Sequence, residues 1–539
     1  MFKSLIIKEI KQNFVSRKSI PALFLFILLY LIIFSFRVID FDKRSESYHQ
    51  DVALLQEKLQ QSQNYSALFI PVVRKPVLFS IFHEGKTHET GNVIYAKYLI
   101  PIISPEFESS ESNLLYRVNH NLDITYLITF LISLLMLITT YDSISAEKEN
   151  GTLRLLVTYG LKRPVILFAK IAGNFMFGSL VFIAPFALSV IYLIIFKSDY
   201  IDSEFVFTML FYLIATLLFI MIMTVIGVSI SVFMKKESRS LVTALALWIL
   251  ISLVIPSTYL VVGKQLIDND SILNIKEKYK ALATERDNFG STVPDSINPG
   301  LYGHWNWNGS NDNFHDNSVL STKGTVDAHI GYNKLYYNTF RDKISIEEDY
   351  ADMIAALNNR PERLKPYLLF FNPVSMYESL MTKLTDTSFD SQIDFLSQVR
   401  SLKISWLDTG LKEGWLFDHA FFSSFSPEYY IDYDEIQNAF KIESPKEYEI
   451  LVNRGENEEL SPDVRNNWFR FMSAYVDKRV SGDYKNSFKV PENMPVYKHN
   501  QRGMIEIITD LSIPMTVTVI FGMIILIITA IKFKKFDVR

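Results

Sequence analysis

The 539-residue sequence contains no cysteine, which excludes disulfide bonds, thiolate metal sites and a cysteine nucleophile. It also lacks the pattern Gly-x-x-x-x-Gly-Lys-Ser/Thr, so the chain has no P-loop with which to bind ATP itself. The net charge of −4 shows no basic excess, and nucleic acid is therefore not an expected partner. Because no metal or nucleophile constellation stands out either, we do not expect an enzyme.

Six long, strongly apolar runs lack aspartate, glutamate, lysine and arginine. A helix needs about 20 apolar residues to cross the hydrocarbon core, and lipid offers no partner for free backbone groups, so each run predicts a transmembrane helix. No ionisable side chain except tyrosine lies near their centres, which argues against a secondary transporter and against a channel with a charged filter. The runs are 20–36, 124–141, 171–196, 205–234, 241–263 and 511–531.

The first run is followed by Arg37-Val38-Ile39-Asp40 and not by a small-residue cleavage site, which predicts a retained helix rather than a signal peptide. The mean hydropathy is +0.14, yet 21 % of the residues are charged, which is typical of membrane helices combined with sizeable water-exposed parts. We therefore predict an all-α polytopic membrane protein with six transmembrane helices and a mainly helical extracytoplasmic domain formed by two insertions.

Basic residues are concentrated at the N-terminus, in the loops after the second and fourth runs, and in the C-terminal tail. The positive-inside rule then places both termini in the cytoplasm, and we expect a multi-pass protein of the bacterial cytoplasmic (inner) membrane with its large domain outside. The predicted parts are a cytoplasmic interfacial helix at 1–19, transmembrane helix 1 at 20–39, extracytoplasmic segment 1 at 40–122, transmembrane helices 2–5 at 123–263, extracytoplasmic segment 2 at 264–510, transmembrane helix 6 at 511–533 and a cytoplasmic tail at 534–539.

The two extracytoplasmic segments show mostly helical patterns. Apolar spacing predicts helices over 51–61, 271–289, 344–357 and 463–480, whereas 290–323 is rich in Gly, Asn, Asp and Ser and predicts an irregular loop. The simplest architecture lets helices one and five continue outward and carry a shared cap.

Three polar stretches of these segments were considered as sites. His83 and His88 resemble a zinc-protease motif but are five residues apart, so they do not share a helix face; a solvated loop is expected, with a weak metal or ligand contact left open. The aromatics of 304–309 favour a loop that anchors itself over one that binds a ligand. The segment 311–316 lacks calcium-loop spacing and predicts turns.

The loop 142–170 between the second and third runs is the most informative segment. Acidic residues come first, then Gly-Thr, a short amphipathic run at 153–157, a glycine break and a basic pair. Two interpretations are equally open from spacing alone: a helix lying on the membrane, or a rigid helix that docks into a cleft on a cytoplasmic partner. The N-terminal residues 1–18 likewise predict an amphipathic helix in the membrane interface.

This loop resembles that of ABC type-2 permeases. The resemblance lies in Glu147-x-Glu149-x-Gly151-Thr152-Leu153, followed by Arg163 and Lys170. The ending Phe536-Asp537-Val538-Arg539 and the stretch Asn372-Pro373…Tyr377-Glu378 are similar to a subgroup with a large insert before the last helix. One departure is that the family often has a proline before the basic residue, where this chain has 159–162 and places Pro164 after Arg163.

The resemblance implies a permease subunit whose coupling loop contacts a separate cytoplasmic P-loop ATPase, with ATP and Mg on that partner and no cofactor in this chain. Gly151 is expected to permit a tight turn, Thr152 to cap the following helix, and Leu153 and Leu156 to enter the partner's cleft. The implied ATPase-coupling residues are Glu147, Glu149, Gly151, Thr152, Leu153, Leu156 and Arg163.

Other expected partners are the lipid bilayer and a second permease copy or a sister permease, with an extracytoplasmic protein as a further candidate. By family analogy the substrate path lies between helices two and five of the two permease halves. Export, or extraction of a lipophilic substrate, is favoured. The alternative hypothesis is a mechanotransmitting or scaffold membrane protein, which would move its extracytoplasmic domain without passing a substrate.

Overall fold

A computed structural model describes residues 2–16, 19–62, 65–83, 85, 93–97, 99–103, 123–294, 297, 323–385, 387–418, 421, 490–492, 494–495, 497 and 504–535. Within these ranges six helices are long and apolar enough to cross a membrane, which confirms all six predicted spans. The helical segments that contain these spans are Ser19–Gln60, Ile124–Glu149, Arg163–Phe196, Ser203–Phe233, Glu237–Leu266 and Leu511–Lys535. The expectations for 304–309, 311–316, 463–480 and 536–539 fall outside the described residues.

The first, third, fourth and sixth spans are each one continuous helix: α2 (Ser19–Gln60), α8 (Arg163–Phe196), α9 (Ser203–Phe233) and α20 (Met504–Lys535). The second and fifth spans are each interrupted by one π-helical turn. The second consists of α4 (Ile124–Leu127), the π turn η5 (Ile128–Ile132) and α5 (Ser133–Thr140). The fifth consists of α10 (Glu237–Ile249), the π turn η7 (Leu250–Val254) and α11 (Ile255–Gly263).

Aspartates begin two of these spans. Asp123 accepts a hydrogen bond from the backbone N–H of Tyr126 at 2.7 Å, and Asp202 accepts one from Phe205 at 2.7 Å. Each satisfies a backbone donor that the first helical turn leaves free, so the side chain fixes where the span starts.

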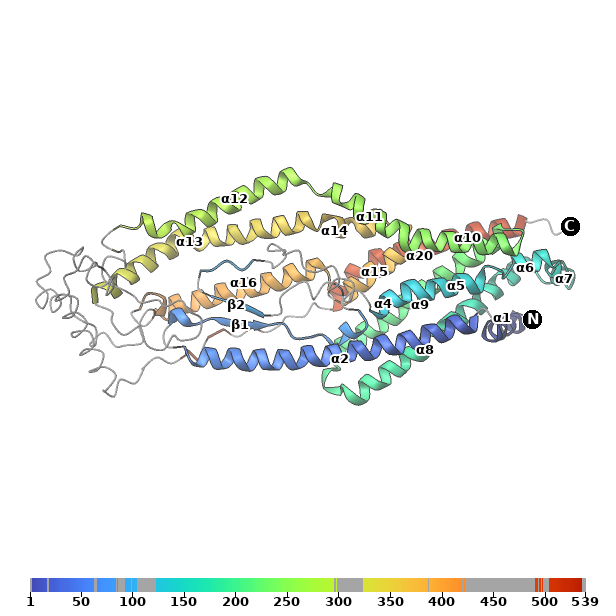
Figure 1. Ribbon diagram of the computed structural model, residues 1–539, viewed down its shortest axis with the longest axis horizontal. Coiled ribbons are helices and arrows are strands. Elements are labelled where there is room, and N and C mark those ends of the chain that lie inside the picture. The colour runs from blue at the N-terminus through green and yellow to red at the C-terminus, as the bar shows by residue number, and fades with distance from the viewer. Residues whose placement is uncertain are drawn as a thin grey trace, which may run out of the picture.

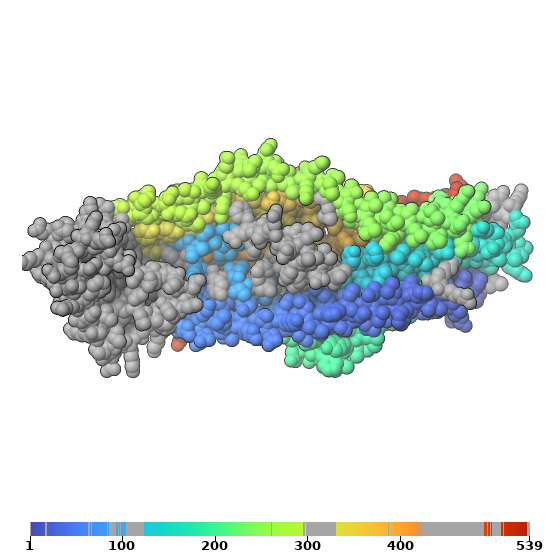
Figure 2. Space-filling model, viewed as in Figure 1, coloured from blue at the N-terminus to red at the C-terminus, as the bar shows by residue number. Residues whose placement is uncertain are grey.

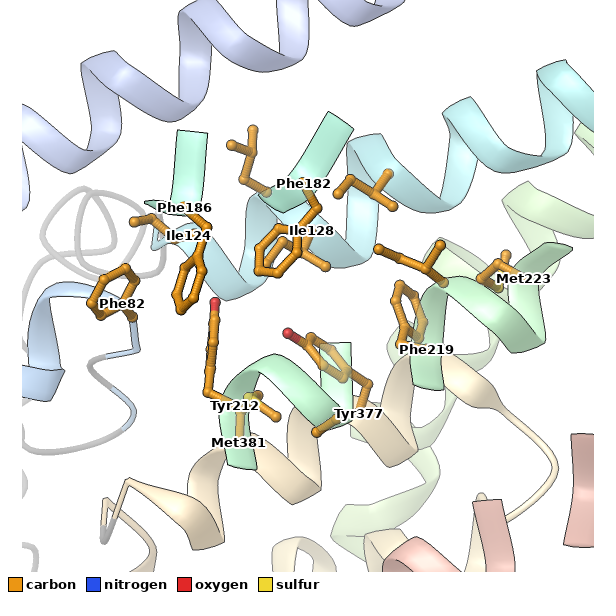
Figure 3. Close-up of a cluster of buried hydrophobic side chains, with 14 of the residues drawn as sticks. Phe82, Ile124, Ile128, Phe182, Phe186, Tyr212, Phe219, Met223, Tyr377 and Met381 are labelled. Carbon is orange, nitrogen blue, oxygen red and sulfur yellow. The ribbon is translucent and has the colours of Figure 1, made fainter. Parts of the chain in front are cut away.

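The bundle is packed around its second and fourth spans. In each of these, 72 % of the most apolar stretch is buried, against 12 % in the fifth span. Aromatic rings fill the centre, and Figure 3 shows Phe182 and Phe186 of α8, Tyr212 and Phe219 of α9 and Tyr377 meeting in one cluster. Both termini lie at the same end of the bundle, called the termini end below (Figure 1).

At the other end, the two insertions form one insert domain. Its helices are the outer half of α2, α12 (Asn269–Asp287), α13 (Lys323–Asn358) and α16 (Phe389–Lys412). Strands β1 (Ile70–Val73) and β2 (Val93–Ala96) pair antiparallel, with Ile70 opposite Ala96. Short 3-10 turns complete it at Tyr65–Ala67, Lys264–Leu266, Phe289–Thr292 and Trp415–Phe417. The turn Leu78–Ile81 of the first insertion packs in the bundle core, and Ser198–Tyr200 joins α8 to α9.

A common core joins the two insertions. Leu68 and Val72 of the first insertion are buried together with Phe340, Val399 and Trp406 of the second. This confirms the shared cap, and α2, α12 and α13 confirm the helices expected over 51–61, 271–289 and 344–357. Helix one continues outward as α2, whereas the fifth helix ends at Gly263 and a 3-10 turn separates it from α12. The elongated body that results has the bundle at one end and the insert domain at the other (Figure 2).

Two expectations need correction. The segment 264–510 does not stay outside the bundle, because α15 (Pro373–Leu384), which follows α14 (Arg360–Leu368), packs against α9 and α20. His83 is not in a solvated loop: it is buried, with Nδ1 2.8 Å from Oδ2 of Asp123. The carboxylate provides the polar partner that a buried imidazole needs.

Candidate functional site

The loop between the second and third spans forms two short helices at the termini end, α6 (Ser145–Glu149) and α7 (Thr152–Thr158) (Figure 1). Gly151 joins them with φ of +73°, and Gly160 follows α7 with φ of +83°. Side chains disfavour this left-handed conformation, so a glycine at each position lets the chain turn sharply. The tight turn expected at Gly151 is therefore present.

A buried lysine holds α6 to two other helices. Lys170 Nζ of α8 lies 2.8 Å from Glu147 Oε1 of α6 and 2.9 Å from Glu9 Oε1 of α1 (Phe2–Val15). All three side chains are at most 15 % exposed, and two carboxylates facing one ammonium group compensate the cost of burying its charge. Glu147 is thus turned into the bundle.

The N-terminal helix α1 packs along the start of α8. Asn13 donates to Asn174 at 2.8 Å, and a Cβ on Gly173 would lie 2.6 Å from the Cβ of Glu9, so the two helices approach closely. The polar residues Glu9 and Asn13 are the most buried positions of α1. A helix is confirmed here, and it contacts the bundle through Glu9 and Asn13 and through Phe14, whose ring lies 4.9 Å from that of Phe177.

The next two residues of the loop bind the turn between the fourth and fifth spans. Lys148 Nζ donates to the carbonyls of Ser231 at 3.3 Å and Met234 at 3.1 Å, and also to that of Val232, at the end of α9. Glu149 Oε2 accepts from the backbone N–H of Glu237 at 2.8 Å, at the start of α10. Each charge faces the helix end whose dipole it complements.

The remaining predicted residues also contact their own chain. Thr152 Oγ1 lies 3.4 Å from the carbonyl of Glu147, so it bonds back to α6 and does not cap α7, whose N-cap is Gly151. Arg163 donates to the carbonyl of Lys534 at 2.8 Å, which joins the start of α8 to the end of α20.

The outward face of α7 is not the predicted one. Leu153 is only 3 % exposed and packs with Phe533 in a core at the termini end, and Leu156 is half-buried against the same core. Leu155 is 58 % exposed and Tyr159 is 77 % exposed. These two residues are four apart and so lie on one helical face.

Several residues of this site were not predicted from the sequence. Glu9 is the single acidic residue of 1–18, which was a usable signal, because an acid in an otherwise basic segment needs a partner. Leu155 and Tyr159 carried no signal that separates them from their apolar neighbours. In the described part of the chain, no three His, Asp or Glu side chains come together as metal ligands.

The family profile described as ABC-2 family transporter protein matches residues 4–409. The chain belongs to this ABC-2 family. Two curated relatives are each called probable ABC transporter permease protein NosY. That of Pseudomonas aeruginosa is 47 % identical over 51 residues, which is 10 % of this chain and 18 % of the relative. That of Stutzerimonas stutzeri is 50 % identical over 48 residues, which is 9 % of this chain and 17 % of the relative.

The matches to these two ABC permeases therefore span less than a fifth of the relatives' length. Membership of the ABC-2 family and the six apolar helices make the chain a multi-pass membrane protein and a transporter permease subunit. ABC permeases work with an ATP-binding subunit, and the chain has no P-loop of its own.

Proposed function

We propose that the chain couples ATP hydrolysis by a separate P-loop ATPase to transport across the bacterial inner membrane. In this proposal the termini end is cytoplasmic, the insert domain is extracytoplasmic, and ATP and Mg are bound by the partner. The exposed apolar pair Leu155 and Tyr159, on a short helix fixed to the ends of several spans, is the observation that carries it. Such a pair fits an apolar cleft on a partner surface.

The loop between the second and third spans is attached to several spans at once. Glu147 is held by Lys170 of the third span, Lys148 and Glu149 hold the turn between the fourth and fifth, and Arg163 holds the end of the sixth. A displacement of α7 by the ATPase is therefore passed to these spans together, because packed interiors transmit strain.

The transported molecule would pass between helices two and five of two permease subunits, either two copies or this chain and a sister chain. Within this chain the two helices meet at Trp248, whose indole N–H donates to Ser133 Oγ at 3.0 Å and whose ring lies 4.8 Å from that of Phe130. Aromatic and aliphatic walls favour a lipophilic substrate, and export is the direction that we propose.

A mechanotransmitter remains the second candidate. It is favoured by α2, which continues for 42 residues from the bundle into the insert domain without a break. Deleting 271–358, which spares α15 in the bundle, distinguishes the two: a mechanotransmitter loses its function while the ATPase stays bound, whereas a transporter keeps ATP-dependent transport.

The deciding experiment is a mild-detergent pull-down of the tagged full chain from its own host, with quantitation of P-loop ATPases by mass spectrometry. The wild-type chain should retain about one ATPase per permease, and Leu155→Asp or Tyr159→Ser should lose it. Leu273→Asp, at a residue 60 % exposed in the insert domain, is the matched control and should retain it. An ATPase that survives Leu155→Asp, or none with the wild-type chain, contradicts the proposal.

A further inference from the structure

The helix α15 enters the bundle at the depth where the second and fifth spans are interrupted. It lies beside α9 and α20 (Figure 1) and contacts both π turns, η5 and η7. Its Tyr377 hydroxyl lies 2.7 Å from Oγ1 of Thr216, near the middle of α9. A segment from between the fifth and sixth spans therefore reaches the interior of the membrane bundle.

The π turn of the fifth span leaves one backbone carbonyl without its usual partner. In an α-helix the carbonyl of Ile251 would accept from the N–H of Ile255, but that N–H bonds Leu250 instead. In the π-helical pattern the donor would be residue 256, which is a proline and has no N–H. Neither donor is available, and in a lipid environment an unsatisfied carbonyl is costly.

Asn372 supplies the missing donor. Its Nδ2 donates to the carbonyl of Ile251 at 2.9 Å, while its Oδ1 accepts from the backbone N–H of Val374 at 3.0 Å and so caps α15. The side chain is fully buried. One amide group thus joins the interrupted hydrogen-bond ladder of the fifth span to the first turn of α15.

Further contacts secure α14 and α15 nearer the insert domain. Tyr259 of α11 donates to the carbonyl of Pro361 at 2.6 Å, and Lys365 of α14 lies 3.2 Å from Glu378 of α15. Burial alone would lower the pKa of Lys365, but Glu378 and the nearby Glu362 outweigh it and hold the pKa of Lys365 above its usual value. Lys365 therefore stays charged and keeps α14 beside α15.

We propose that Asn372 is a positioning residue for transport, which holds α15 on the π turn of the fifth span and thereby connects that span to the insert domain. π-helical turns are frequent at functional sites and at helix kinks, and α16 follows α15 after a short turn. When the spans rearrange, α15 moves with the fifth span and carries α16. This inference rests on the proposed function, because the rearrangement is driven from the termini end.

The first test asks whether Asn372 acts through the free carbonyl. In the full chain in lipid nanodiscs, Asn372→Leu should speed hydrogen exchange of the amides in and after η7 by about tenfold or more, as expected for loss of a buried hydrogen bond. Adding Pro256→Ala restores an N–H at the position that the π turn requires, and exchange should return to within about threefold of wild type.

The control for this test is Asn359→Leu. Asn359 donates to the carbonyl of Ala355 within its own segment, so its loss should leave exchange at η7 unchanged. If Pro256→Ala fails to reverse the effect of Asn372→Leu, or if Asn359→Leu reproduces that effect, the assigned role of Asn372 is wrong.

The second test measures whether the fifth span and the insert domain move together, in the full chain bound to its ATPase. The chain has no cysteine, so spin labels can be placed by single substitutions. Leu273→Cys with Ile404→Cys reports α12 against α16, at residues 60 % and 45 % exposed. Lys162→Cys with Lys235→Cys, both exposed, reports the termini end.

On addition of ATP and vanadate, both distances should change in the otherwise wild-type chain. With Asn372→Leu, the pair at the termini end should still respond, while the change between α12 and α16 should be lost. An unchanged response of α12 and α16 in Asn372→Leu overturns the inference. No response of the termini-end pair in the wild-type chain would instead overturn the proposed ATPase coupling, so the two failures are distinguishable.

Discussion

Lys170 Nζ lies 2.8 Å from Oε1 of Glu147 and joins the loop between the second and third spans to the third span. On its other side it meets Glu9 at 2.9 Å. Replacing the lysine by Met leaves two buried carboxylates facing each other without a cation. We expect Lys170→Met to destabilise the chain by about 3–5 kcal/mol, because breaking a buried pair leaves uncompensated charge. Thermal unfolding in mild detergent measures this loss, and hydrogen exchange should rise in α6 and α7.

The matched control removes all three charges together. Glu9→Gln with Glu147→Gln and Lys170→Met buries no unpaired charge and should recover most of the lost stability, since a buried ion cluster is often replaceable by neutral groups. If Lys170→Met alone unfolds at the wild-type temperature, the cluster does not hold the loop.

Substitution of Gly151 is predicted to destabilise the chain because of the backbone conformation at this position, and not because of the atoms around it. No atom lies within 4 Å of a Cβ built on it, yet its φ is +73°. Gly151→Ala should therefore cost about 1–2 kcal/mol of local stability from backbone conformation alone. Gly151→Asn should cost less, because asparagine tolerates this conformation better. Hydrogen exchange of α7 is the measurement.

Gly290 is the matched control for this prediction. It also has open space around it but no positive φ. Gly290→Ala should change stability by no more than about 0.5 kcal/mol, as surface substitutions usually do. Equal effects at both glycines would show that conformation at Gly151 is not what matters.

The six spans were predictable because each is a long run without charge, and lipid allows such a run only one regular structure. The position of α15 inside the bundle was not predictable from the sequence. Pro373–Leu384 has only 12 residues and contains Glu378, so its composition is that of a short helix in a water-soluble domain. In the bundle, its apolar side chains Val374, Tyr377, Leu380, Met381 and Leu384 are buried in the core. Asn372 bonds the carbonyl of Ile251, 121 positions away in sequence, and no local pattern predicts that pairing.

The loop between the second and third spans shows a different limit of prediction from sequence. Its short helix, its glycine turn and its acidic residues follow from the sequence. Leu153 and Leu155 are equally apolar, but Leu153 lies in a buried core with residues of several spans, among them Ile166 and Phe533, while Leu155 is exposed. Periodicity identifies an amphipathic helix but does not distinguish a face covered by the same chain from one left for a partner.

Asp123 predicts a pH-dependent contribution to stability. Burial alone would raise the pKa of Asp123, but the facing His83 and the N–H of Tyr126 outweigh it and hold the pKa below its ordinary value. A lowered carboxyl pKa stabilises the folded chain above the unfolded-state pKa of about 3.9, and this stabilisation is lost as pH falls through the folded-state value.

Asp123→Asn keeps a side chain that can cap the helix but removes the charge. We expect it to cost about 1.5–3 kcal/mol at pH 7, the range for hydrogen bonds to charged groups. The difference from wild type should narrow only below about pH 4. Thermal unfolding of both proteins between pH 3 and pH 8 checks this, and a difference that widens as the pH falls would contradict it.

Arg400 should decide whether the first insertion stays attached to the second. Its Nη2 donates to the carbonyl of Ile102 at 2.7 Å and to Asp352 at 3.0 Å, and Lys403 beside it donates to the carbonyl of Ile100 at 3.1 Å. Arg400→Met leaves Asp352 with no cation and should cost about 3–5 kcal/mol, with faster proteolysis in the first insertion.

A lysine does not replace this arginine, because it cannot bond the carbonyl of Ile102 and the carboxylate of Asp352 with the same planar group. Arg400→Lys should therefore recover less than half of the loss. Arg341→Met is the control: Arg341 is 50 % exposed and 3.6 Å from Asp408, and an exposed pair of this kind contributes about 0–1 kcal/mol. If Arg341→Met and Arg400→Met are equally mild in thermal unfolding and limited proteolysis, apolar packing around Val399 and Trp406 holds the insertions together without the arginine.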